Sequence, residues 1–145
     1  MFNTVRFALA VVAATVVDAA YGFVVYGLLL HDQFAAHPGV YRPEEVAGPY
    51  MPFIFLGTFI AMIAATYIYV KGYEGGSGLQ EGLGFGAALG VFALGYDGIV
   101  NYAVLNIGRR LGGSMAIAAF AEWLIAGIVI GLIYKPAAGV AAARA

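Results

Sequence analysis

The chain has 145 residues, of which 63% are hydrophobic and only 10% charged, and its formal net charge is −1. Soluble domains carry about a quarter charged residues, so this composition indicates a protein of the lipid bilayer. The charges form no basic stripe, which excludes a nucleic-acid-binding surface, and the lack of cysteine excludes disulfides and thiolate metal sites. Because four spans of about 20 residues would use most of the length, we expect one integral membrane domain over residues 1–145, an all-α four-helix transmembrane bundle.

The first predicted span covers residues 5–30 and carries Asp18 near its middle. The stretch is long enough to cross a bilayer. Its apolar character continues past Asp18, which distinguishes it from the short core of a cleaved signal peptide. We therefore expect a retained helix with a carboxyl group deep in the membrane.

A polar connection over residues 31–48 follows, rich in proline, glycine, histidine and charge, and we expect it to lie in water. It contains His31 and His37, but these lack the i, i+4 spacing of a helical metal site, and no histidine lies inside a span where a haem would need one. The sequence thus predicts no metal and no cofactor.

Three further spans are predicted at residues 50–71, 82–107 and 115–134. The second carries Thr58, the third carries Asp97 with Asn101 one turn later, and the fourth carries Glu122. A glycine-rich flexible loop is expected between the second and third spans, and a tight turn at 108–114 between the third and fourth.

With four spans, both chain termini lie on one side of the membrane. Four cationic residues fall on that side and three on the other: Arg6, Lys71, Lys135 and Arg144 against Arg42, Arg109 and Arg110. The small excess predicts cytoplasmic termini by the positive-inside rule.

A weak internal repeat is also present. The first and third spans each hold an Asp beyond the midpoint, and the second and fourth end in the similar segments Ile68-Tyr-Val-Lys and Ile133-Tyr-Lys. The pattern favours two parallel two-helix repeats related by an axis along the membrane normal, with a chance match as the alternative.

The depth of the three acids brings them to one level. At ~1.5 Å per residue, Asp18 lies roughly 20 Å and Asp97 roughly 22 Å from the terminal side. Glu122 enters from the opposite side and, in a core of about 30 Å, also lies about 20 Å from the terminal side. Since Thr58 falls at nearly the same depth, we expect a layer of polar groups.

Glycines mark the expected helix contacts. Gly82, Gly86 and Gly90 recur every four residues and lead to Asp97 at i+7, so one helical face combines a glycine groove with an acid. Gly127 and Gly131 form a GxxxG element on the fourth span. Such glycine-zipper patterns predict close approach of helix backbones.

No Lys or Arg lies in the interior of a span, so the acids lack an ionic partner. Because a low dielectric and mutual repulsion both disfavour the charged form, we expect at least two of the three to be protonated at neutral pH. Their expected hydrogen-bond partners are Asn101, Tyr21, Tyr26, Thr58 or water. Polar residues also hold membrane helices together, each contributing on the order of 1 kcal/mol. Three acids at one level favour a function over this simpler role.

Three short motifs resemble those of an uncharacterised family of small four-helix bacterial membrane proteins. They are Asp18-Ala-Ala-Tyr-Gly, Tyr96-Asp97 followed by Asn101, and Glu122-Trp123 followed by Gly127. The chain departs from that pattern in having Tyr21 for Trp, Asn101 one residue further from Asp97, and Glu122 for Asp. The resemblance implies a multi-pass protein of the bacterial cytoplasmic membrane and no particular chemistry.

Two functions are consistent with these features. The first is a proton-linked carrier or small-solute-binding protein that uses Asp18, Asp97 and Glu122. The second is an accessory subunit that packs on a larger membrane complex through its glycine faces. An enzyme is not expected, because no nucleophile–base pair or metal set is recognisable. The expected partners are the bilayer and either further copies of the chain or a larger complex.

Overall fold

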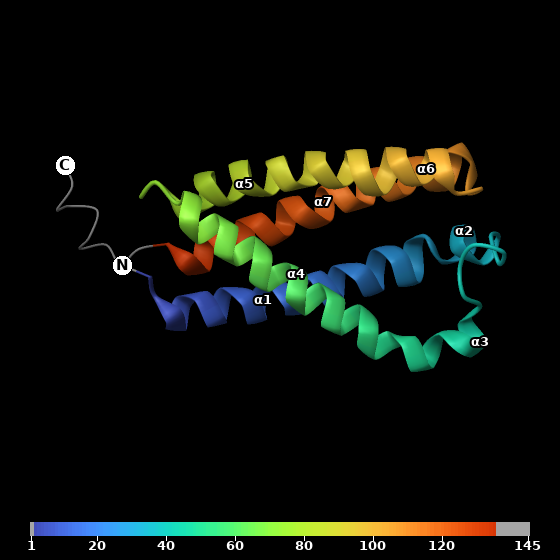
Figure 1. The fold of residues 1–145 in the computed structure, drawn as a ribbon, viewed down its shortest axis with the longest axis horizontal. Helices are drawn as coiled ribbons and strands as arrows, with labels where there is room; N and C mark the ends of the chain where they lie inside the picture. The colour runs from blue at the N-terminus through green and yellow to red at the C-terminus, as the bar shows by residue number, and fades with distance from the viewer. Residues whose placement is uncertain (1, 136–145) are drawn as a thin grey trace.

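The computed structural model describes residues 2–135, which form helices and no strand. Four helical segments are long and apolar enough to cross a membrane: Thr4–Leu29, Glu44–Gly72, Gly78–Val104 and Gly108–Tyr134. They run up and down in alternation (Figure 1). The predicted all-α four-helix bundle is confirmed, as expected for chains that must satisfy every backbone polar group internally in lipid.

The first and third segments share an unusual construction, since each passes from α-helix into a seven-residue π-helical stretch. The first half of the chain forms α1 (Thr4–Gly22), η1 (Phe23–Leu29), α2 (His31–Ala35), α3 (Glu44–Ala47), η2 (Gly48–Tyr50) and α4 (Met51–Gly72). The second half forms α5 (Gly78–Ala93), η3 (Leu94–Val100), α6 (Asn101–Val104) and α7 (Gly108–Tyr134). In both cases the π stretch lies toward the end of the bundle that carries α2 (Figure 1).

The connection before α7 is shorter than the sequence indicates. We expected a turn over residues 108–114, which is wrong, because these residues form the first turns of α7. The chain reverses at Gly108, whose positive φ of 67° suits glycine. Gly112 lies inside α7 and packs closely on Tyr102, because a Cβ there would lie 3.0 Å from the Cβ of Tyr102.

The packing of the four segments is uneven. α5 and α7 lie side by side along their length, and α1 packs on both α7 and α4 (Figure 1). Direct contact between α4 and α5 is slight by comparison. The two halves are therefore not packed equivalently, and their origin as repeats stays a prediction.

Glycines bring the backbones of α5 and α7 into contact. A Cβ on Gly82 would lie 2.6 Å from the Gly127 carbonyl oxygen, and one on Gly86 would lie 2.7 Å from that of Leu124. A Cβ on Gly90 would lie 2.8 Å from the carbonyl oxygen of Phe120. The glycine face of α5 is thus covered by α7 of the same chain.

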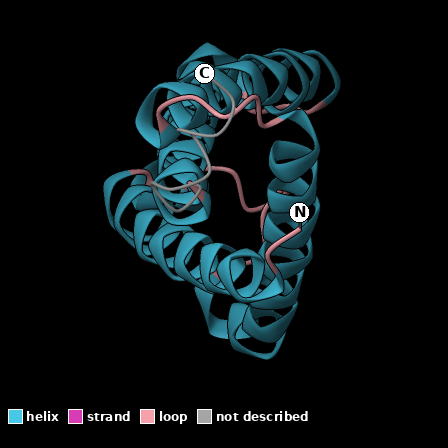
Figure 2. Cartoon of the chain, turned by 90° about the vertical axis from the view of Figure 1, so that its left-hand side faces the viewer, coloured by secondary structure: helices cyan, strands magenta, loops and turns pink. Residues whose placement is uncertain are grey.

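Both ends of the described chain lie at one end of the bundle, as predicted (Figure 1), and this end faces the viewer in Figure 2. The Asn3 side-chain Oδ1 caps α1 by accepting a hydrogen bond from the Arg6 backbone N–H at 2.9 Å. The Asn3 backbone N–H donates to the Tyr134 hydroxyl at 3.2 Å. The Arg6 guanidinium donates to the Lys135 carbonyl oxygen. We call this end the terminal side and the opposite end, which carries α2 and α3, the loop side. Arg144, used in the charge count, lies outside the described residues.

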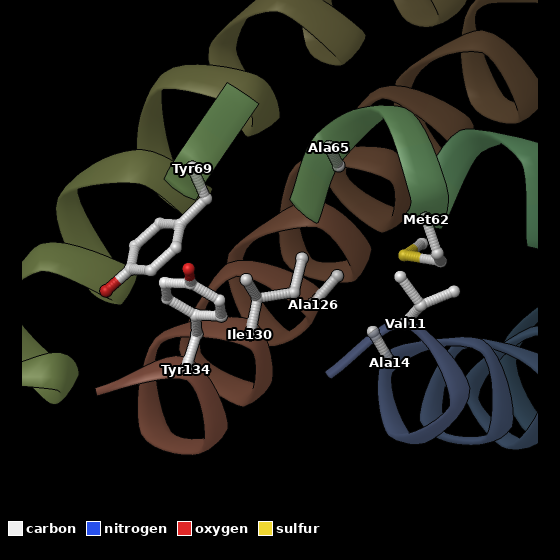
Figure 3. Close-up of a cluster of buried hydrophobic side chains, with 8 residues drawn as sticks. All are labelled: Val11, Ala14, Met62, Ala65, Tyr69, Ala126, Ile130 and Tyr134. Carbon is white, nitrogen blue, oxygen red and sulfur yellow. The ribbon is translucent and has the colours of Figure 1, made fainter. Parts of the chain in front are cut away.

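A buried apolar cluster fills the terminal half of the bundle between α1, α4 and α7 (Figure 3). Its members are Val11, Ala14, Met62, Ala65, Tyr69, Ala126, Ile130 and Tyr134. Small residues of α1 and α7 meet the larger Met62 and Ile130, which are almost wholly buried. This terminal-side cluster forms a buried apolar layer next to the acids described below.

Candidate functional site

Three polar residues lie one helical turn from the terminal-side cluster, on its loop side. Asp18 follows Ala14 by four residues, Glu122 precedes Ala126 by four, and Thr58 precedes Met62 by four. Residues four apart share a helix face. The faces of α1, α4 and α7 that pack together in the cluster therefore direct these polar side chains toward one another.

The two acids of this layer meet. The Asp18 carboxyl lies near the Glu122 carboxyl and the Thr58 hydroxyl. Both acids are partly buried. Two carboxylates in direct contact repel too strongly to be ionised together, so one proton between them stabilises the arrangement. We call Asp18 and Glu122 the acid pair.

Tyr26 forms a hydrogen bond with the acid pair. The sequence indicates it only as one of several possible partners. Its hydroxyl donates to Glu122 Oε2 at 2.8 Å. Eight residues of regular α-helix would leave Tyr26 about 80° around the axis from Asp18. The π-helical stretch η1 begins at Phe23, and each of its turns holds about one residue more than an α-helical turn. Tyr26 therefore returns to the helix face that carries Asp18.

The same shift explains the position of Asp97. The regular glycine series predicted that Asp97 would face α7, but Gly98, eight residues after Gly90, is the buried residue that lies against Ala116. Asp97 is exposed, and although its charge acts on Glu122, it makes no hydrogen bond with the acid pair within residues 2–135. The third acid therefore lies at the edge of the site rather than inside it.

Two other predicted ligands are engaged differently. The Tyr21 hydroxyl donates to the Ala118 carbonyl oxygen at 2.8 Å, and its ring meets that of Tyr26 edge-on at 6.2 Å. Tyr21 thus supports the Tyr26 ring rather than binding an acid. Asn101 begins α6, and in the described part of the chain its side chain forms no hydrogen bond with any of the three acids.

Aromatic residues of the 31–48 connection cover the loop side of the site. Phe34 lies 6.3 Å from the Tyr26 ring and 4.7 Å from that of Tyr41, both edge-on. The Tyr41 hydroxyl donates to Met115 Sδ at 3.2 Å, and burial raises the pKa of this phenol, which keeps it a neutral donor. The 31–48 connection is therefore tied to the site through Tyr26 and to α7 through Met115.

The groups around the acid pair are neutral donors. The single ion pair among residues 2–135 joins His31 to Glu44 at 4.0 Å on the exposed connection. In the same range no three His, Asp or Glu side chains gather in a metal-binding arrangement. A protonated carboxyl pair of this kind can release its proton with a change of one unit of charge, or exchange it for a monovalent cation with no change of net charge.

Comparisons with protein-family profiles, with curated proteins and with solved structures give no match to the chain. Its function is therefore inferred from the arrangement of its own side chains.

Proposed function

We propose that the protein is a proton-linked carrier or small-solute-binding protein of the membrane, which uses the acid pair. The observation that supports this most is the contact between carboxyls from two different helices, with Tyr26 and Thr58 as neutral partners. A single Asp at the centre of a membrane helix costs about 2.5 to 3.5 kcal/mol on insertion. Holding helices together needs only one polar contact, so a second acid on the partner helix is better explained by use of the shared proton.

The surroundings support coupling between proton and movement. Toward the terminal side the pair is followed by the buried apolar cluster around Met62 and Ile130, and toward the loop side it meets Tyr26, which in turn contacts Phe34. Loss of the shared proton would raise the negative charge of the pair from one unit to two and disfavour the contact between the two carboxyls. The π stretches η1 and η3 border the site, and π-helical turns are frequent at functional sites. Protonation would therefore bias two arrangements of these segments.

Proton flux across a bilayer provides the test. Purified protein in liposomes that contain a trapped pH-sensitive dye and carry an imposed pH gradient should conduct protons. Asp18→Asn and Glu122→Gln should abolish this flux, because each removes one member of the pair. Asp32→Asn, which alters an exposed acid of α2, is the matched control and should leave the flux unchanged. Equal flux in the wild type and in Asp18→Asn would remove the acid pair from the mechanism.

An accessory subunit of a larger membrane complex is the second candidate. The proposed glycine-zipper faces are already occupied within the chain, so a partner would need another surface. The first half of α4 offers one, since four consecutive apolar residues are at least half exposed: Phe53, Ile54, Phe55 and Leu56. Consecutive residues point to all sides of a helix, so this half of α4 is bare all around. A second copy of the chain could cover the same surface.

The two candidates differ in the particle that mild detergent extracts. A carrier should be recovered alone or as a homo-oligomer, whereas an accessory subunit should be recovered with other chains. For either, we propose the bacterial cytoplasmic membrane with cytoplasmic termini.

A further inference from the structure

A shallow groove of about 300 Å³ lies on the outer surface of the helical hairpin formed by η3, α6 and α7. It is separate from the acid pair. Its lining is Gly98, Ile99, Tyr102, Arg109, Gly112, Gly113 and Ala116. Gly98 and Gly112 let Ala116 and Tyr102 pack closely across the hairpin, and at Gly113 an added Cβ would meet nothing within 4 Å, so the groove is open there.

The groove runs along the helices, from the loop-side rim into the membrane. Tyr102 lies against Gly112, and Gly98 lies against Ala116, which fixes an antiparallel register between the two walls. Arg109 and Ala116 are seven residues apart on α7, or about 10 Å along the axis. One end of the groove is therefore at the level of lipid headgroups, and the other reaches the hydrocarbon.

The charge at the rim is unbalanced. Arg109 has no carboxylate within ion-pair distance in the described part of the chain, and Arg110 follows it. Both lie in the first turn of the 27-residue α7, where the helix dipole adds positive potential. By the register of the hairpin, Asp97 lies about 12 Å deeper than Arg109.

We propose that this groove binds one anionic phospholipid, with an acyl chain along the glycine lining and the phosphate at Arg109. The apolar floor and the membrane depth select a lipid over a free phosphate ion. A guanidinium binds phosphate oxygens in pairs. A zwitterionic lipid carries the same phosphate with a compensating cation, so the positive rim favours a headgroup with net negative charge.

Native mass spectrometry of the intact protein in mild detergent tests the first part of this proposal, the preference for an anionic headgroup at Arg109. Phosphatidylglycerol and phosphatidylcholine with identical acyl chains are added in equal amounts. The wild type should retain one phosphatidylglycerol several-fold more than phosphatidylcholine. Arg109→Gln should abolish this preference. The control Arg42→Gln should keep it, because Arg42 lies on the 31–48 connection, over the Tyr50 ring.

The second part of the proposal, that an acyl chain lies along the glycine lining, is tested by filling the groove with a side chain. Gly113→Leu should lose the retained lipid, whereas Gly84→Leu should keep it, because Gly84 is an equally open helical glycine on α5, outside the groove. Circular dichroism checks that each variant is folded. Equal retention of the two lipids by the wild type would overturn the proposal, as would equal losses in Gly113→Leu and Gly84→Leu.

Discussion

At the scale of single residues, two hydroxyls on the inner face of α4 are buried without a partner. Thr66 is 0% exposed and Tyr69 is 3% exposed, and neither hydroxyl oxygen has a hydrogen bond within residues 2–135. Figure 3 shows the Tyr69 ring beside that of Tyr134, with its hydroxyl turned away from Met62. A buried polar group left unpaired costs about 1–3 kcal/mol, so these hydroxyls lower the stability of the terminal half.

Removing the Tyr69 hydroxyl should therefore not destabilise the protein. In Tyr69→Phe the ring keeps its edge-on contacts with Phe85 and Tyr134, while the unpaired oxygen is lost. We expect an unchanged or higher midpoint of thermal unfolding, followed by circular dichroism in detergent. Tyr134→Phe is the comparison, because it removes an acceptor used by the Asn3 amide and should lower stability by ~0.5–1.5 kcal/mol. An equal loss in both variants would show that Tyr69 has a partner after all.

At the scale of helices, the contact between α5 and α7 depends on the absence of side chains. On Gly86 an added Cβ would lie 2.8 Å from the Trp123 carbonyl oxygen and 2.7 Å from that of Leu124. Backbone atoms cannot rotate away as a side-chain end can. Two helices held this closely must separate if either receives a larger residue.

Gly86→Leu is accordingly expected to destabilise the bundle by about 1–3 kcal/mol or more, the usual range for overpacking a well-filled contact. Gly84→Leu, two residues away, faces open space and should be neutral or slightly stabilising, since leucine favours helix more than glycine. Thermal unfolding of the two variants side by side measures the difference. If both were equally stable, the close backbone contact would not exist.

The helices also show where reasoning from the sequence succeeds and where it stops. Apolar runs of membrane length give the four spans, because length and hydropathy alone determine them. The depth calculation predicts a common layer for Asp18, Glu122 and Thr58, and these three residues lie near one another in the structure. For Asp97 both the expected level and the expected face are wrong: it lies about 12 Å from the level of Arg109, against about 20 Å for Glu122.

The π turn explains the wrong face, and the start of α5 at Gly78 instead of residue 82 explains the wrong level. Counting along a helix assumes 3.6 residues per turn, and the extra residue taken up by η1 and η3 moves every later position around the axis. This brings Tyr26 to Glu122 and turns Gly98, instead of Asp97, toward α7. Hydropathy and residue spacing do not distinguish a π stretch from a regular α-helix, so this shift could not be predicted from the sequence.

At the scale of the whole molecule, the up-and-down arrangement fixes which segments share a side of the membrane. The chain has no cysteine, so a single introduced cysteine reports its own location without background. In cells, Ala36→Cys on the loop side should react with a membrane-impermeant maleimide added outside. Ser77→Cys, in the loop between α4 and α5, should react only after the cells are permeabilised. The reverse pattern would place the termini outside, and labelling of both from one side would contradict the bundle.

The acid pair joins the first and last long helices, and this has a consequence for how the protein is made. Synthesis adds about 5–20 residues per second, and Glu122 follows Asp18 by roughly a hundred residues, so α1 waits for several seconds before α7 exists. During that interval Asp18 must enter the bilayer alone, and the neutral, protonated acid enters most easily. Helix α1 is therefore expected to insert with Asp18 neutral, before its partner Glu122 on α7 has been made.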